Sequence, residues 1–314
     1  MKTTFYILAV CALTGLFSCN SGQRKSQSET EGSENDKVSI IHQFGTTEVP
    51  KNPKRIVVLD FGALENLTAL NIKPVAIPKT GLPQYLSQYK SDPSIVDVGN
   101  LVEVNLERIN EAKPDLIIIG GRLASSYQQI SQIAPTICLS TDYKDFLESF
   151  EKNITDLSKI FDTADKLNEA LVSLKNRIEV VKSKTSLSDS KALVLIHNKG
   201  KFSAYGSGSR FGIIHDIFGI KEAKSGLDIH PHGNPVSSEF IQQVNPDILF
   251  IVDRSAVVNN EALDKKQIEN KLVQKTNAFK NNKIIYLNSE AWYLSGGGGI
   301  TSLNIMIDEI HKSI

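Results

Sequence analysis

The chain has 314 residues, with 35 Lys and Arg against 35 Asp and Glu, so its formal net charge is zero. A balanced charge leaves no basic footprint for nucleic acid, and we expect no nucleic-acid partner. The length beyond a short N-terminal leader is enough for two ordinary domains.

The first residues have the pattern of a secretory signal. Lys2 precedes a mostly apolar run over 5–17, which is too short for a membrane-spanning helix of about 20 residues. Residues 16–19 (LFSC) resemble a bacterial lipobox, in which the cysteine is lipidated and becomes the mature N-terminus. We therefore predict a lipoprotein signal peptide over 1–18 and a lipid anchor on Cys19.

The segment 19–37 is polar, rich in Ser, Gly, Glu, Gln and Lys, and has almost nothing to bury. We predict a disordered tether that holds the folded part near a membrane, on the periplasmic or extracytoplasmic face of the cell envelope. Once the leader is removed and Cys19 is lipidated, Cys138 is the only remaining thiol. No internal disulfide and no thiolate metal cluster can then form. Cys138 lies in apolar sequence and is expected to be a small buried side chain.

The first half alternates apolar strands with helices. Residues 55–60 (RIVVLD) predict a strand that leads into a helix over 63–70, and 73–78 (KPVAIP) predict a further strand. The segment 105–122 (NLERINEAKPDLIIIGGR) predicts a short helix, a Pro-Asp turn and a continuous apolar strand. Such strands, buried on both faces, belong to parallel sheets covered by helices.

A long helix is predicted between the two halves. Asp162 or Thr163 opens it, and its apolar residues recur at spacings of four and three: Leu167, Leu171, Leu174, Ile178 and Val181. This is one apolar stripe on a helix, and it covers too few heptads to favour a coiled coil. We predict a linking helix over 156–186, between an N-terminal lobe over 38–155 and a C-terminal lobe over 187–314.

The second half repeats the scheme of the first. Strands are predicted over 192–198 and 201–206, and Ser209 caps a predicted helix that runs to Gly219. The segment 237–254 (SSEFIQQVNPDILFIVDR) then aligns with 105–122 without a gap. The identical residues are Glu107/Glu239, Ile109/Ile241, Pro114/Pro246, Asp115/Asp247, Ile119/Ile251 and Arg122/Arg254. One copy in each half predicts an α/β fold of two similar lobes, with mainly parallel sheets, bridged by one long helix.

The repeat also predicts a binding cleft. Arg122 and Arg254 each follow directly on a predicted strand, and ligands of open parallel sheets lie outside the carboxyl ends of the strands. Both guanidinium groups should therefore face one cleft. Glu107 and Glu239 open the preceding helices, which begin at the same edge, so they should lie near the rim of each lobe.

Together with the lipobox, the two lobes and the linking helix, four motifs carry a family resemblance: the segment 105–122, YGSGSRFG (205–212), HGNPVSSEF (232–240) and AWYLSGGGG (291–299). From about Val38 to the C-terminus, the sequence resembles a bacterial siderophore-binding lipoprotein of an iron ABC transporter. More narrowly, it is similar to the branch that binds iron(III)-catecholate siderophores of the petrobactin and enterobactin type. The resemblance implies a fold like that of class III periplasmic binding proteins, with limited closure, no catalysis and no intrinsic cofactor. It also implies a monomer whose partners are the ferric siderophore, the permease and its ATPase.

The resemblance further implies a set of site residues. Arg122, Arg210, Arg254 and Trp292 would contact the ligand, His232 and Tyr293 would bind the iron of the bound siderophore, and Glu107 and Glu239 would dock on the permease. For Trp292, plain packing is the alternative to a place on the cleft wall, and His230 is a rival of His232.

The chemistry of these residue types agrees with an iron(III)-catecholate. Guanidinium groups hold planar anionic oxygens through paired hydrogen bonds, and phenolate and imidazole are known iron and metal ligands. Two catechols would leave two iron positions open, for His232 and Tyr293. The glycines at 296–299 are expected to let the backbone approach a bulky ligand closely.

Several alternatives stay open. The same fold could bind haem, cobalamin or a hydroxamate siderophore, and His230, His232 and Asp228 could begin a site for a bare metal ion. A surface hydrolase or a reductase would need a nucleophile paired with a base, or a redox cofactor site, and the sequence indicates neither. YGSGSRFG lacks the lysine of a phosphate-binding loop.

Overall fold

The computed structural model describes residues 36–259 and 261–314. The predicted signal peptide, the lipidation of Cys19 and the tether up to residue 35 lie outside these residues. The tether prediction ended at Lys37, but Lys37 already begins strand β1 (Lys37–His42). This strand pairs antiparallel with β2 (Gly45–Pro50) in a hairpin that was not predicted from the sequence. No helix among the described residues is long and apolar enough to cross a membrane.

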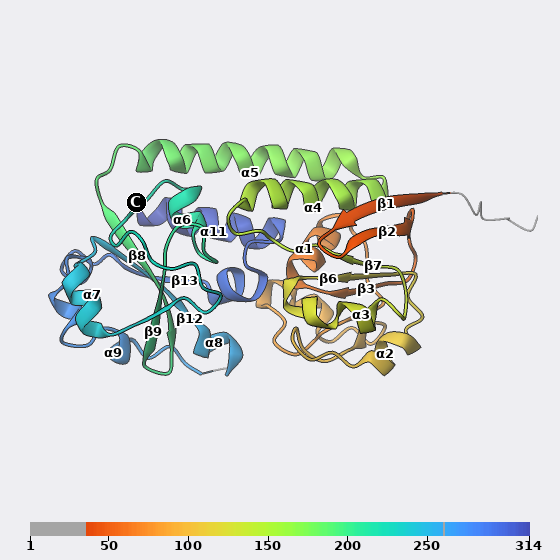
Figure 1. The fold of residues 1–314 in the computed structure, drawn as a ribbon, viewed down its shortest axis with the longest axis horizontal. Coiled ribbons are helices and arrows are strands. Elements are labelled where there is room, and N and C mark those ends of the chain that lie inside the picture. The colour runs from red at the N-terminus through yellow and green to blue at the C-terminus, as the bar shows by residue number, and fades with distance from the viewer. Residues whose placement is uncertain (1–35, 260) are drawn as a thin grey trace, which may run out of the picture. The chain divides into compact units, whose positions relative to one another are not determined.

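The first lobe is built on a five-stranded parallel sheet (Figure 1). Its strand order is β5 (Val96–Asp97), β4 (Ala76–Ile77), β3 (Ile56–Leu59), β6 (Leu116–Ile119) and β7 (Thr136–Cys138). Its helices are α1 (Phe61–Ala69), η1 (Gln84–Tyr89), α2 (Leu106–Glu111), η2 (Gly121–Ser126) and α3 (Tyr127–Ile130). Every residue of β3 and β6 is buried, as a central parallel strand requires.

One strand of this lobe is shorter than predicted, and its cysteine is buried as predicted. The strand predicted over 73–78 forms only over Ala76–Ile77, because Pro74 and Pro78 have no N–H to donate to a strand ladder. Cys138 is a buried free thiol at the end of β7, as expected. Burial raises the pKa of the thiol to about 11.

Two helices lie between the lobes in the chain, α4 (Phe146–Phe161) and α5 (Ala164–Thr185). The linking helix predicted over 156–186 is therefore wrong at its start, since residues 156–161 belong to α4. Asp162 takes a left-handed conformation that ends α4, and α5 begins two residues later. The predicted stripe of α5 is buried except for the half-buried Leu171, and α5 packs on α4 and on α11 (Ile300–Ser313) of the second lobe (Figure 1).

The second lobe contains a mixed sheet. Its strand order is β11 (Asn234–Val236), β9 (Lys201–Tyr205), β8 (Lys191–Asn198), β12 (Ile248–Asp253) and β13 (Ile284–Leu287), with β10 (Lys221–Glu222) also paired to β8. The pairs β8–β12, β12–β13 and β8–β10 are parallel, whereas β9 pairs antiparallel with β8 and β11. The remaining elements are α6 (Ile213–Asp216), α7 (Ser238–Val244), α8 (Arg254–Val258), α9 (Lys265–Ile268), η3 (Val273–Lys275), α10 (Asn277–Lys280), η4 (Glu290–Ser295) and α11.

The helix predicted from Ser209 to Gly219 is reduced to the four residues of α6. The hydroxyl of Ser209 donates to the carbonyl of Gly206, so it does not cap a helix. The chain instead forms turns around Arg210, one of the predicted ligand-binding residues.

The internal repeat has one structural role in both lobes. Asp115 accepts hydrogen bonds from the backbone N–H groups of Lys54 and Arg55, just before β3. Asp247 accepts one from the N–H of Lys191, the first residue of β8. Each Pro-Asp turn therefore fixes the start of the neighbouring parallel strand, and the predicted fold class of two α/β lobes is confirmed.

Candidate functional site

Tyr293 lies on the short π-helix η4, which ends at Gly296 in a left-handed conformation. The preceding Trp292 is only 1 % exposed, and its indole N–H donates a 2.8 Å hydrogen bond to Oε2 of Glu309 on α11. The expectation that Trp292 contacts the ligand is therefore wrong, since its ring is packed in the core and its N–H is satisfied there. The ring of Tyr293 is only half-buried and lines a cavity.

Three arginines that were predicted from distant parts of the sequence surround Tyr293. Nε of Arg254 donates a 2.9 Å hydrogen bond to the phenol oxygen, and Nη2 of Arg122 and of Arg210 donate to the backbone carbonyl of the tyrosine. The guanidinium carbons lie 4.3 Å (Arg210), 5.2 Å (Arg122) and 5.8 Å (Arg254) from the ring centroid. All three are within reach of a cation–π contact.

Within residues 36–259 and 261–314, the three arginines of this cluster make no direct ion pair with a carboxylate, although the buried Asp60 acts on Arg122 through its charge. Nε of Arg210 is buried and has no hydrogen-bond partner in the described part of the chain. Burial, and then the charge of Arg210, lower the pKa of Arg122. A buried donor left without an acceptor is costly, so this site favours an anionic ligand.

The same arginines act on the phenol of Tyr293. Burial alone would raise the pKa of Tyr293, but the hydrogen bond from Arg254 and the charges of Arg210, Arg254 and Arg122 outweigh it and lower the pKa. Opposite charges at this range favour the ionised form. The tyrosine is therefore prepared to act as a phenolate.

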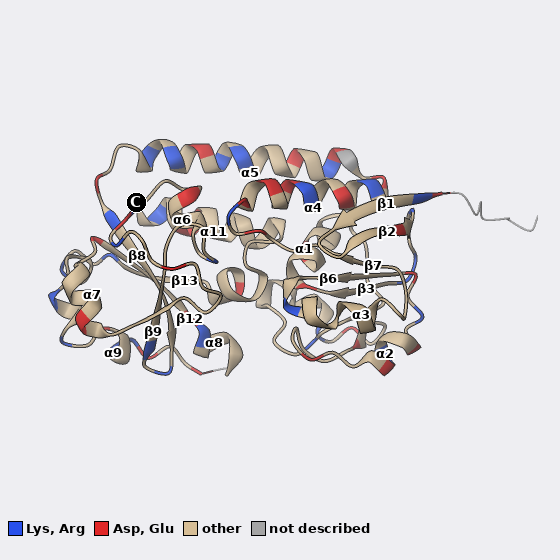
Figure 2. Cartoon of the chain, in the orientation of Figure 1, with Lys and Arg blue, Asp and Glu red and all other residues tan. Residues whose placement is uncertain are grey.

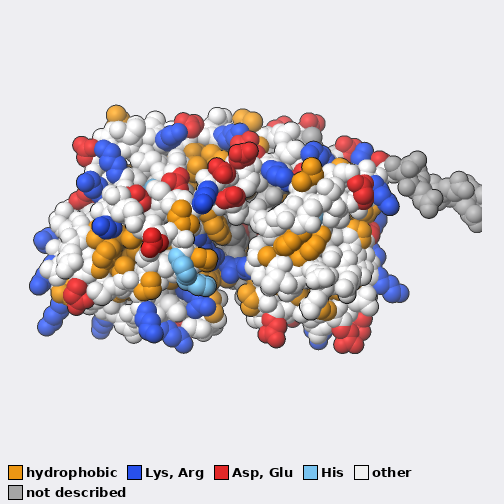
Figure 3. Space-filling model, viewed as in Figure 1, with side chains coloured by type: hydrophobic (Ala, Val, Ile, Leu, Met, Phe, Trp, Pro, Cys, Tyr) orange, Lys and Arg blue, Asp and Glu red, His pale blue; other side chains and the backbone are white. Residues whose placement is uncertain are grey.

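A cavity of about 310 Å³ lies between the two lobes beside Tyr293. Arg122 and the loop 100–102 line it from the first lobe, and Arg254, Tyr293 and the end of α8 line it from the second. Figure 3 shows a furrow between the lobes, with histidine and basic side chains beside it. A concave site with a few convergent polar groups is typical of ligand pockets.

Two further tyrosines belong to the neighbourhood of Tyr293, and neither was predicted. Tyr205 ends β9, packs edge-on against Phe211 with ring centroids 4.8 Å apart, and has its pKa raised to about 12 by burial. Tyr143 follows β7, and its hydroxyl would lie 3.9 Å from a Cβ placed on Gly296. Its position just past the carboxyl end of a parallel strand is a signal that could have identified it.

Two of the glycines after Tyr293 lie very close to the first lobe. A Cβ on Gly62 of α1 would lie 2.7 Å from the carbonyl carbon of Gly298, and a Cβ on Gly299 would lie 2.2 Å from Oε2 of Glu65. Gly298 and Gly299 therefore allow a close approach to helix α1 of the first lobe, and the close approach of the glycine backbone to a ligand stays a prediction.

Side chains of the first lobe bind the start of α11 in the second. The carboxylate of Glu65 is 1 % exposed and accepts hydrogen bonds from the N–H of Ser302 (2.7 Å) and the hydroxyl of Tyr85 (3.2 Å). Oδ1 of Asn66 accepts from the N–H of Ile300 (3.0 Å). Burial is the largest effect on Glu65 and raises its pKa to about 7. The contacts of Glu65 and Asn66 with the start of α11 hold the two lobes together next to the segment that carries Tyr293. We call these contacts the clasp.

His230 and His232 are both exposed on the loop before β11. Their ring centroids are 5.9 Å apart, and the N–H of His232 donates to Nδ1 of His230 at 3.2 Å. Gly233 has a φ of +68°, and a Cβ there would lie 2.6 Å from the ring of Tyr205, so the loop is held close to the tyrosines of the site. No group of three His, Cys, Asp or Glu suited to a metal ion is found in the described ranges.

Glu107 and Glu239 lie in the first turns of α2 and α7, and both are exposed. The helices are capped in the same way, by Asn105 in one lobe and Ser237 in the other, each accepting a hydrogen bond from the N–H three residues later. In Figure 2, red segments of the ribbon mark acidic residues on both helices, one helix in each lobe. The repeat thus places one carboxylate at an equivalent surface position of each lobe.

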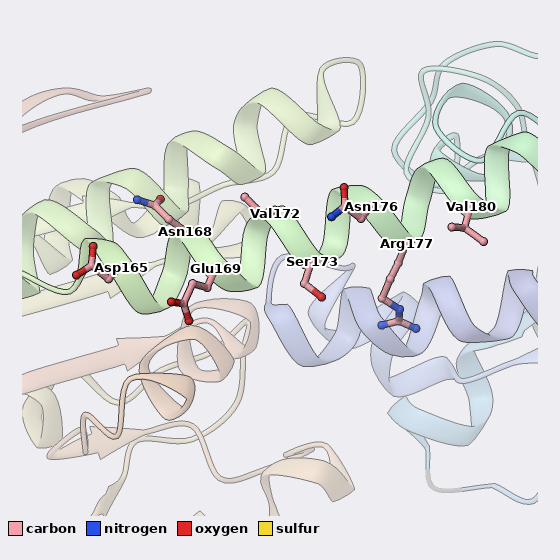
Figure 4. Close-up of a pocket in the computed structure, with 8 residues that line it drawn as sticks. All are labelled: Asp165, Asn168, Glu169, Val172, Ser173, Asn176, Arg177 and Val180. Atoms are coloured by element: carbon pink, nitrogen blue, oxygen red, sulfur yellow. The ribbon is translucent and has the colours of Figure 1, made fainter.

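A larger recess of about 760 Å³ lies elsewhere, along α5 (Figure 4). Its described lining residues all belong to that one helix: Asp165, Asn168, Glu169, Val172, Ser173, Asn176, Arg177 and Val180. They recur at helical spacing and form one face, and among these residues no polar groups converge from a second element. We therefore place the candidate site at the arginine cluster and not at this larger recess along α5.

Taken together, the fold and the cavity are those of a two-lobed binding protein. Residues 56–291 match the periplasmic binding protein family, and the chain belongs to it. The resemblance to a substrate-binding protein of a transporter, stated from the sequence, is thereby confirmed.

Curated relatives match over nearly the whole length. The petrobactin-binding protein YclQ of Bacillus subtilis is 39 % identical over 99 % of this chain and 98 % of its own. The ferric-anguibactin-binding protein FatB of Vibrio anguillarum is 33 % identical with the same coverage. The crystal structure of YclQ superposes with a TM-score of 0.86, at 41 % identity over 88 % of this chain and 98 % of that chain. The periplasmic catecholate-siderophore binding protein VctP of Vibrio cholerae gives a TM-score of 0.83, at 32 % identity over 88 % of this chain and 99 % of that chain.

Proposed function

We propose that this chain is the substrate-binding lipoprotein of an ABC importer and captures an iron(III)-catecholate siderophore in the cleft between its lobes. The observation that carries the proposal is the cluster of three arginines around Tyr293 without a carboxylate partner in the described chain. A catecholate complex of iron(III) is multiply negative and presents planar oxygens, which guanidinium groups bind well. The names of the relatives, which refer to petrobactin, anguibactin and catecholate siderophores, agree with this ligand class.

Tyr293 and His232 would complete the coordination of the iron if the siderophore supplies only two catechols. The arginine hydrogen bond and charges lower the pKa of the phenol, so the proton is easily lost to solvent when a ferric ion approaches, and the phenolate oxygen becomes a ligand. The imidazole of His232 is exposed on a loop held against Tyr205 by Gly233. A movement of this loop would bring an imidazole to the metal, and His230 is the competing ligand.

Delivery would use the matched carboxylates of the two lobes. Glu107 and Glu239 are exposed at equivalent positions of the repeat, where each can pair with a basic residue of the permease. A lipid on Cys19 and the tether 19–35 would keep the receptor beside the permease and its ATPase, on the extracytoplasmic face of the membrane. We expect one chain to act as a monomer.

The ligand class is tested by titrating the folded protein, without residues 1–19, with chelates of different charge. We expect the tightest binding for a ferric bis-catecholate, with an affinity that decreases as salt is added because screening weakens charge interactions near the surface. A ferric hydroxamate, haem and cobalamin should bind much more weakly. Preferential binding of any of these three would replace the proposed ligand, and chemical change of the recovered siderophore would contradict a purely binding role.

A further inference from the structure

The cavity beside Tyr293 has a second wall that carries no charge. Leu101 and Val102 form it from the first lobe, and Val257 and Val258 form it from α8 of the second lobe. Arg122, Arg254 and Tyr293 line the same cavity. One continuous space therefore has a cationic side and an aliphatic side.

The aliphatic side is unusual because part of it remains open to water. The side chain of Val102 is 67 % exposed and that of Val258 is 47 % exposed. A single exposed apolar residue needs no explanation, but these two come from different lobes and line the same cavity. Apolar surface that rims a cleft is typical of a binding site.

Local hydrogen bonds order the two chain segments that carry these valines. Oδ1 of Asn100 accepts from the N–H groups of Val102 (2.9 Å) and Glu103 (2.8 Å), which fixes a tight turn with Val102 at its tip. On the other lobe, Asp253 caps α8 by accepting from the N–H of Ser255 (3.0 Å). Val258 is thus presented by a capped helical turn. Because these segments are ordered before binding, less conformational entropy is lost when a ligand packs against them.

We propose that this aliphatic wall is a subsite for the hydrocarbon spacer that joins the two catechols of the siderophore. The inference rests on the proposed function and adds the part of the ligand that the arginines do not recognise. The charged iron centre would face Arg122, Arg254 and Tyr293, and the spacer would lie against Val102 and Val258. The wall would select among bis-catecholates by the length and polarity of the spacer, since these share the same iron centre.

The experiment compares three ferric ligands: unlinked catechol, a bis-catecholate with a short aliphatic spacer, and one with a spacer longer by several methylenes. We expect the wild-type protein to prefer the longer spacer, by up to about fourfold for each methylene that becomes buried. The double variant Val102→Asn, Val258→Asn should lose this preference and bind unlinked ferric catechol as the wild type does. Val180→Asn, at a half-exposed valine of α5 outside the cavity, should keep the preference.

The outcomes separate the subsite from the function on which it rests. If the wild type binds all three ligands with the same affinity, or if the double variant keeps the preference, the subsite is wrong and the arginine site stands. If the wild type binds none of them, the proposed function fails and the subsite with it. A second measurement covers a double variant that does not fold. With the corresponding gallium(III) complexes, the methyl resonances of Val102 and Val258 in the wild type should shift with the long spacer and not with unlinked catechol. Unchanged methyl resonances would overturn the subsite.

Discussion

Arg122 and Arg254 occupy the same position of the internal repeat, yet they contact Tyr293 at different atoms. Arg254 is the first residue of helix α8 and reaches the phenol oxygen from within its own lobe. Arg122 lies in the 3₁₀ turn η2 and crosses between the lobes to the backbone carbonyl. The repeat therefore determines that both guanidinium groups reach one site, and the structure after each strand determines which atom each one meets.

The two arginines also differ in whether their contact with Tyr293 crosses from one lobe to the other. Arg122 reaches the carbonyl of Tyr293 while Glu65 and Gly62, on α1 of the same lobe, contact the start of α11 and the glycine segment just after η4. Arg254 needs no such contact, because α8 and η4 belong to one lobe. The first-lobe arginine should be sensitive to the clasp between the lobes, and the second-lobe arginine should control the phenol.

The largest effect is expected for Arg254→Gln. The variant should bind ferric bis-catecholate about 100-fold more weakly, since a hydrogen bond to a charged group contributes about 1.5–3 kcal/mol. It should also raise the pKa of Tyr293, because the phenol loses both its hydrogen bond and a nearby charge. Titration with the ferric complex and ultraviolet titration of the phenol measure the two effects.

Arg122→Gln is the matched variant for this comparison. It should weaken ligand binding but change the pKa of Tyr293 less, because Arg122 contacts the backbone carbonyl and not the phenol. Arg108→Gln, at an exposed arginine of α2, controls for the loss of one positive charge. Equal shifts of the phenol pKa in the Arg122 and Arg254 variants would contradict the division of roles between the repeats.

The clasp should make stability depend on pH through Glu65. The pKa of Glu65 is about 7 in the folded protein against 4.5 for a free glutamate, so the folded state binds more protons than the unfolded state between these values. The contribution of Glu65 to the free energy of unfolding should be highest below about pH 4.5, decrease as the pH rises toward 7, and then level off. The contribution of this group amounts to about 2 kcal/mol between pH 5 and 8.

Denaturant unfolding of the wild type and of Glu65→Gln at pH 5 and pH 8 measures this contribution. The variant has no group to titrate at this position, so its stability should decrease less over the same interval. If the variant and the wild type show the same decrease, Glu65 is not the group responsible.

A smaller loss is expected for Gly62→Ala, at about 1.5 kcal/mol of the free energy of unfolding. The new methyl group would lie 2.7 Å from the backbone of Gly298, and crowding in a packed region typically costs about 1–3 kcal/mol. Gly121→Ala is the control, because its nearest neighbour would be at an ordinary 3.7 Å. Thermal unfolding of both variants separates a specific lobe contact from a general effect of glycine replacement.

No effect on ligand affinity is expected for Glu107→Gln and Glu239→Gln. Both carboxylates are exposed on helices α2 and α7, and neither lines the cavity. Siderophore uptake by cells that carry either variant should fall, since each removes one proposed contact with the permease. Unchanged uptake in the double variant would remove these residues from the docking surface.

The parts of the site that the sequence predicted are those that periodicity and strand direction control. Arg122 and Arg254 could be placed in one cleft because each follows the carboxyl end of a parallel strand in its own lobe, which is the edge where such sheets bind ligands. The positions of Trp292 and the glycines could not be predicted in this way. A single turn of π-helix turns Trp292 into the core while Tyr293 faces the cavity. The first-lobe partners of Gly298 and Gly299 lie more than 200 residues earlier in the chain.

The direct test of the central claim, that Tyr293 and its arginines form the receptor for a ferric catecholate, is a titration of the soluble part with ferric bis-catecholate that follows the charge-transfer absorbance. The account predicts tight binding with a shifted band in the wild type, and binding without that shift in Tyr293→Phe. The same band in both proteins would contradict phenolate ligation, and the absence of binding to the wild type would contradict the proposed ligand class.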